Sequence, residues 1–133
     1  MSFVFEIDAE RREVRIVGSG PSNFRETARF IERGIHGHHY EPDYAIFIDL
    51  RALEYVPSLA EARRFATMFR SLHNVYGGPM AVLVQTAVGF GMASLIAVLI
   101  RAIGYHMRAF QHPEEAHAWL DQAKAKTRVK PSP

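Results

Sequence analysis

Residues 79–100 read PMAVLVQTAVGFGMASLIAVLI, and the interpretation of this stretch decides the fold. It holds 22 residues without a charged side chain, enough to span a bilayer as one helix. However, Gly89 and Gly91 interrupt its middle, and the polar Gln85 and Thr86 precede them. The first part is rich in strand-forming residues, whereas the second is apolar over several turns. We therefore predict a buried strand over 80–85, a turn at Gly89 and a separate helix over 92–104, not a membrane span.

On either side of this stretch, strand patterns alternate with helix patterns. Alternating apolar and polar residues predict strands over 3–8 and 13–17, joined as a hairpin that ends at Gly18-Ser19-Gly20-Pro21. An unbroken apolar run predicts a buried strand over 44–50, and a short strand follows at 107–110. Further helices are predicted to begin near residues 23, 58 and 113. The order β-β-α-β-α-β-α-β-α predicts an α/β fold with a small, mixed, mostly parallel sheet covered by helices.

The composition is that of one globular domain. The chain has 133 residues, of which 48% are hydrophobic and 23% charged, enough for a core of its own. The absence of cysteine excludes disulfides and fits a reducing cytoplasm. The net charge is only +2, and the basic excess lies at the C-terminus, which argues against a nucleic-acid partner. We predict a cytoplasmic domain over residues 1–122, followed by a basic, flexible tail over 123–133.

Polar side chains follow the buried strands at the edge where open α/β sheets bind ligands. Asp49 and Arg51 follow the strand over 44–50, Gln85 and Thr86 end the strand over 80–85, and His112 follows the last strand. We predict a ligand or partner site at this edge. Each of these residues also has a structural interpretation, because such side chains commonly end strands, cap turns or begin helices.

Ser58 is a candidate for regulation. It lies three residues before Glu61, which is the spacing of a capping box at a helix start. A phosphate on this serine would meet free backbone N–H groups and the positive end of the helix dipole. The pattern therefore predicts a helix cap and permits a phosphorylation site.

His36, His38 and His39 are the only candidate metal ligands that stand out. Histidines two apart on an extended segment can bind Zn²⁺ or Ni²⁺, but a loop without fixed geometry is a poor metal site, and we expect a solvated loop here. The sequence has no Gly-x-Ser-x-Gly nucleophile elbow and no complete phosphate-binding loop. We therefore expect a non-enzymatic protein without a cofactor.

The predicted helix over 92–104 is apolar nearly all round, so that it needs cover on more than one side. One side can lie on the sheet. A neighbouring helix can cover the other, as can a second subunit that packs on Leu95 and Leu99, or a small apolar, lipid-like ligand in a pocket beside the helix.

Two stretches give the chain a family resemblance. Ala45-Ile46-Phe47-Ile48-Asp49-Leu50 is followed by residues 53–59 and a helix, and residues 110–120 close with Ala116-His117-Ala118-Trp119-Leu120. In these patterns and in element order, the chain resembles the STAS domains of anti-sigma-factor antagonists, specifically the SpoIIAA-like branch, over about residues 3–122.

The resemblance implies a non-catalytic regulatory or protein-interaction module. STAS antagonists bind a kinase that is also an anti-sigma factor, and they are phosphorylated on a serine at the helix start to which Ser58 is close. The family pattern there is roughly Asp-Ser-Ser-Gly-Leu, whereas this chain has Pro57-Ser58-Leu59-Ala60-Glu61. The SpoIIAA-like branch is also similar in fold to lipid-binding Sec14-type domains, which agrees with an apolar ligand.

Overall fold

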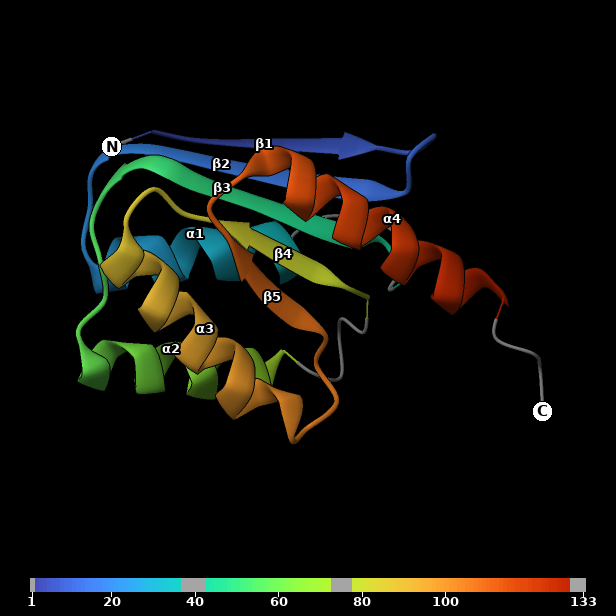
Figure 1. Cartoon of the computed structure of the whole chain (residues 1–133). Helices are drawn as coiled ribbons and strands as arrows, with labels where there is room; N and C mark the ends of the chain where they lie inside the picture. The colour runs from blue at the N-terminus through green and yellow to red at the C-terminus, as the bar shows by residue number, and fades with distance from the viewer. Residues whose placement is uncertain (1, 37–42, 73–77, 130–133) are drawn as a thin grey trace.

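A five-stranded sheet forms the centre of the protein in the computed structural model, which describes residues 2–36, 43–72 and 78–129 (Figure 1). The strands lie side by side in chain order: β1 (Ser2–Asp8), β2 (Glu13–Pro21), β3 (Ala45–Glu54), β4 (Met80–Leu83) and β5 (Met107–Phe110). β1 is antiparallel to β2, and every later pair is parallel. The predicted mixed, mostly parallel sheet with one hairpin is therefore confirmed.

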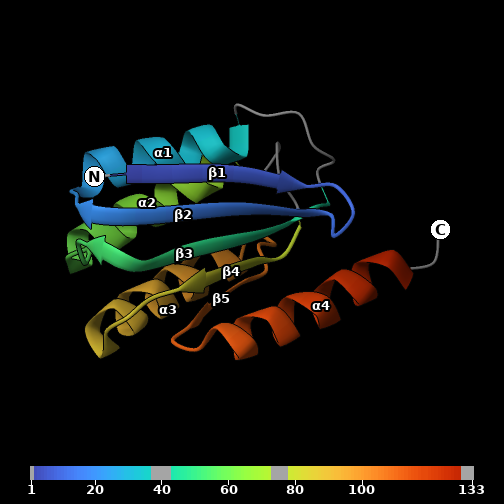
Figure 2. The ribbon, with the colours of Figure 1, turned by 90° about the horizontal axis from the view of Figure 1, so that it is seen from above.

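Three helices cover one face of the sheet and one helix covers the other. α1 (Phe24–His36), α2 (Leu59–Ser71) and α3 (Ala87–Arg101) each connect two parallel strands, and α4 (Pro113–Val129) follows the last strand. Because all three crossovers advance in the same direction, their common right-handedness places them on the same face. α4 makes no crossover, and it lies on the opposite face (Figure 2).

β3 is the strand on which both cores are built. Its Ile46 and Ile48 face the cluster formed with α1, α2 and α3, whereas Ala45 and Phe47 face the smaller cluster under α4. Alternation of side chains along a strand explains why an unbroken apolar run is needed here, since both faces are buried.

The helix predicted over 92–104 begins five residues earlier and ends three residues earlier. α3 starts at Ala87, because the Thr86 side chain caps it by accepting a hydrogen bond from the Gly89 backbone N–H at 3.0 Å. Gly89 and Gly91, predicted as the break before the helix, lie inside its first turns. The strand before it is correspondingly shorter than predicted and ends at Leu83.

β2 and β3 both run further than the sequence predicts. The Gly18-Ser19-Gly20-Pro21 segment, expected to stop the hairpin, continues β2 past a register shift between Val17 and Ser19. In this extension Ser19, Gly20 and Pro21 lie beside Ala52, Leu53 and Glu54 of β3. Pairing with β3 therefore keeps this glycine-containing segment extended.

α4 continues to Val129, so that residues 123–129 of the predicted tail lie in this helix. Lys124 lies in this continuation and contacts the β1–β2 hairpin. Its ammonium lies 3.5 Å from the carboxylate of Glu13, which is only 3% exposed, and it donates to the Arg11 carbonyl at 3.2 Å. A buried carboxylate requires such a partner, and the contact fixes α4 against the hairpin.

Within the described residues, no helix is long and apolar enough to cross a membrane. The charge-free stretch is divided between β4 and α3, as predicted.

The fold predicts opposite effects for two helical glycines. A Cβ on Gly34 would lie 2.5 Å from the Phe5 ring and 2.8 Å from Ile16, whereas a Cβ on Gly91 would meet nothing within 4 Å. Gly34→Ala should lower the free energy of unfolding by about 1–3 kcal/mol through overpacking. Gly91→Ala should raise it by up to about 1 kcal/mol through helix propensity. Urea denaturation measures both; a stabilised Gly34→Ala would contradict this packing of α1.

The Glu13–Lys124 pair generates a second prediction. Lys124→Met keeps most of the side-chain stem but leaves the buried carboxylate with Arg15 alone, at 3.6 Å. We expect a loss of about 2 kcal/mol in the free energy of unfolding. Adding Glu13→Gln should recover part of this loss, because the uncompensated charge is then removed. A double variant whose loss equals the sum of the losses from Lys124→Met alone and Glu13→Gln alone would show that the pair is not coupled.

Candidate functional site

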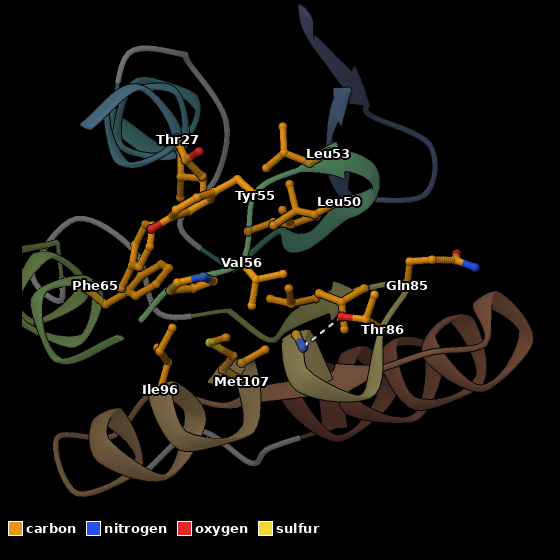
Figure 3. A pocket seen from close by; sticks show the side chains of 18 residues that line it. Thr27, Leu50, Leu53, Tyr55, Val56, Phe65, Gln85, Thr86, Ile96 and Met107 are labelled. Atoms are coloured by element: carbon orange, nitrogen blue, oxygen red, sulfur yellow. Dashed lines mark hydrogen bonds between the residues drawn. The ribbon is translucent and has the colours of Figure 1, made fainter. Parts of the chain in front are cut away.

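An apolar pocket of about 90 Å³ lies at the carboxyl edge of the sheet (Figure 3). It exists because β3 continues to Glu54, whereas its neighbour β4 ends at Leu83 and pairs with β3 only as far as Asp49. Beyond that point β3 has no strand beside it on the β4 side. Leu50, Leu53 and Tyr55 from this unaccompanied end form one wall of the pocket.

The three helices of the same face form the other walls. α1 contributes Thr27 and Ile31, α2 contributes Phe65 and Phe69, and α3 contributes residues of its first three turns. From α3 these residues are Gly89, Ala93 and Ile96. The pocket therefore contacts every element that covers this face.

The three hydroxyls of the wall are bonded within the protein. The Thr27 hydroxyl pairs with the Ser22 hydroxyl at 2.8 Å, the Tyr55 hydroxyl donates to Glu61 at 3.1 Å, and the Thr86 hydroxyl oxygen accepts from the Gly89 N–H. None of the lining residues carries a carboxylate, amine, guanidinium or imidazole. Such a wall suits an uncharged, apolar group, because it offers contact area and little polar recognition.

Exposed apolar side chains occur in the two segments that lead into the pocket. Val56 and Leu59 are 42% and 52% exposed, and Val88 and Phe90 are 64% and 38% exposed. Val56 itself lines the pocket, and the other three are near neighbours in the chain of the lining residues Pro57 and Gly89. We call these four residues the apolar rim.

A hydrogen-bond network joins the pocket wall to the start of α2. Glu61 accepts from the Tyr55 hydroxyl and, at 3.0 Å, from the Ser58 backbone N–H, while the Ser58 hydroxyl accepts from the Glu61 N–H at 3.2 Å. The predicted capping box is thus present. The Ser58 backbone bond, followed by the bond from Tyr55, lowers the pKa of Glu61 against the opposing effect of burial. Burial, and then the nearby Glu61 charge, raise the pKa of Tyr55.

Of the predicted edge residues, Gln85 and Thr86 line the pocket. They differ in orientation, since the Gln85 amide extends away from the other labelled side chains, whereas the Thr86 hydroxyl turns back to the α3 backbone (Figure 3). Thr86 is therefore a helix cap as well as part of the wall.

Asp49, Arg51 and His112 do not line this pocket. The Asp49 carboxylate accepts from the Arg51 backbone N–H and Nε at 3.1 Å each and from its Nη2 at 2.9 Å. Burial raises the pKa of Asp49, but the hydrogen bonds and charge of Arg51 outweigh it and hold the pKa below the usual value. His112 is exposed, and its carbonyl accepts from the Ala116 N–H at 3.2 Å, as a residue at a helix start does.

The remaining candidates lie elsewhere. His36 ends α1, and His38 and His39 lie outside the described residues. No cluster of three potential metal ligands occurs in the described part of the chain. Leu95 and Leu99 are half-buried and pack against the main core, and Val98 between them is 59% exposed. Their role as a dimer face stays a prediction.

Tyr55, Thr27 and Phe65 are among the pocket residues that the sequence analysis did not select. Leu53 and Tyr55 alternate with the polar Glu54, and this was the available signal that the extended chain continues beyond Leu50. Nothing in the sequence indicated Thr27, because its place in the wall depends on how α1 packs against α2.

Comparison with known proteins supports the fold. No protein-family model matches the sequence, and no curated protein matches it significantly. A solved structure of an uncharacterized protein from the DUF3478 family of Shewanella loihica PV-4, described as having a SpoIIAA-like fold, matches with a TM-score of 0.57. The match covers 90% of this chain and 92% of that one at 14% identity, a level at which it speaks for the fold alone. The fold implied by the family resemblance is confirmed, and the chain has a SpoIIAA-like fold.

Proposed function

We propose that this protein is a non-enzymatic binding module of the regulatory STAS type, whose site is the apolar pocket at the carboxyl ends of β3 and β4. One observation carries the proposal: the pocket has an uncharged wall whose hydroxyls are already bonded within the protein. Chemistry on a substrate would require polar groups directed into the space, whereas binding of an apolar group requires only shape and contact area.

The size of the pocket limits what enters it. A volume of about 90 Å³ is smaller than the dry cavity of about 150 Å³ that is known to hold benzene or xenon. The buried part of the ligand is therefore a small aliphatic group, and the rest of the ligand lies at the mouth against the apolar rim. We assign the predicted apolar ligand site beside the 92–104 helix to this pocket, which lies between the first turns of α3 and the end of β3.

We propose a second role for Ser58, as a phosphorylation site that communicates with the pocket. Ser58 is exposed at the start of a 13-residue helix, where a phosphate meets free N–H groups. A phosphate there would repel the Glu61 carboxylate, which holds the Ser58 backbone and the Tyr55 hydroxyl. Phosphorylation would thus release Tyr55 from its position in the wall. By family resemblance, the modifying partner is a kinase of the anti-sigma type, in the cytoplasm.

The proposed site can be tested with xenon as an apolar probe. Xenon pressure should shift the ¹H–¹⁵N resonances of pocket residues such as Ala93 and Thr86 while leaving those of α4 unchanged. Ala93→Leu places a larger side chain in the pocket and should abolish the shifts. Val98→Leu, at an exposed position on the same helix, is the control and should behave as the wild type. Absence of xenon-dependent shifts in the wild type would remove the proposed site.

The Ser58 proposal makes a separate prediction. Ser58→Ala removes the cap and should lower the free energy of unfolding by about 1 kcal/mol, whereas Ser58→Asp retains a capping oxygen and should lose less. Incubation with cell extract and ATP should yield a phosphate on Ser58 by mass spectrometry. If mass spectrometry finds no phosphate on Ser58 and Ser58→Asp keeps full stability, Ser58 serves only as the cap of α2.

A further inference from the structure

The residues around the pocket indicate which kind of molecule carries the apolar group that enters it. The pocket has room for the end of one aliphatic group, and the apolar rim adds exposed apolar residues on the segments that line it. A small pocket for one side chain together with neighbouring exposed apolar residues is the usual form of an anchor site in protein–protein recognition.

Charge near the rim favours an acidic occupant. α1 and α2 together carry six arginines against three glutamates. Within α2, Glu61 is turned back into the capping box and the Tyr55 bond, and it lies near enough to Arg64 for that arginine to lower its pKa. Arg63 is exposed and, like the other arginines of these two helices, forms no ion pair with any described residue.

Arg63 is also placed to act together with the rim. It follows Leu59 by four residues, so the two side chains project from the same face of α2, one turn apart. A ligand that covers Leu59 therefore meets a positive charge about one helical turn further on.

From these observations we infer that the natural occupant of the pocket is an aliphatic side chain of a partner protein, carried on an acidic segment whose carboxylate pairs with Arg63. The inference rests on the proposed binding function and specifies its ligand. A leucine-sized side chain suits a volume of about 90 Å³, whereas the long acyl chain of a lipid needs a larger volume than this pocket supplies. The partner is thus recognised by one apolar anchor and one adjacent acid.

The test is a selection from a phage-displayed library of random peptides on the full chain, followed by titration of the most enriched synthetic peptide. Enriched peptides should share an aliphatic residue with aspartate or glutamate within four positions. Ala93→Leu should weaken binding by about tenfold or more, since it fills the anchor pocket. The milder Ala93→Val serves if Ala93→Leu does not fold, and should weaken binding in the same direction.

Reversing the charge of Arg63 measures the electrostatic contribution to peptide binding. Arg63→Glu should weaken the peptide by about threefold or more, and added salt should reduce the difference from wild type. Arg70→Glu, an exposed change near the other end of α2, is the matched control and should leave affinity unchanged. Equal losses from the two reversals, or enriched peptides without acids, would overturn the inference.

If a lipid surface or a second copy of the chain occupies the pocket, the measurements differ from those expected for a partner protein. Binding to vesicles of phosphatidylglycerol without any peptide enrichment would assign the rim to a lipid surface and refute the protein partner. A dimer that Ala93→Leu dissociates would assign the pocket to a second copy, with the same consequence. Xenon entry without peptide enrichment would refute this inference alone, whereas failure of xenon to enter would refute the proposed function beneath it.

Discussion

The unequal lengths of β3 and β4 are the constraint on which the rest of the site depends. β3 has ten residues and β4 has four, and they pair only from Ile46 to Asp49 on β3. A strand that continues without a neighbour must have its apolar side chains covered by something else. Here α1, α2 and the first turns of α3 provide the cover, and they leave a space that they do not fill completely.

The same geometry connects the pocket to the surface. Tyr55 belongs to the wall, and its hydroxyl is held by the glutamate that closes the cap of α2. A change in the wall therefore alters the hydrogen bonds at the helix start, and a change at the helix start alters the wall. In this protein the Glu61 carboxylate is both a structural cap and the link between the interior and Ser58.

Much of the fold could be predicted from sequence, because the decisive signals are local. The buried strands around Ile46 and Val82 and the capping box at Ser58 follow from short patterns, and Gln85 and Thr86, predicted at the sheet edge, line the pocket there. The extension of β2 through Gly18–Pro21 depended on pairing with β3, which is distant in sequence. The start of α3 at Ala87 depends on a local bond from the Gly89 N–H to the Thr86 cap. The walls of the pocket could not be predicted in detail, because Thr27, Tyr55 and Ala93 share no pattern and meet only through helix packing.

The order of the strands has a consequence for how the chain can assemble. Each strand pairs with the one that precedes it in sequence, so every new pairing closes a loop no longer than one crossover. The sheet can therefore grow from the N-terminal hairpin outward while the chain leaves the ribosome, without waiting for a distant segment. Low sequence separation between neighbouring strands favours rapid folding, and the last helix then closes the one face that the crossovers leave open.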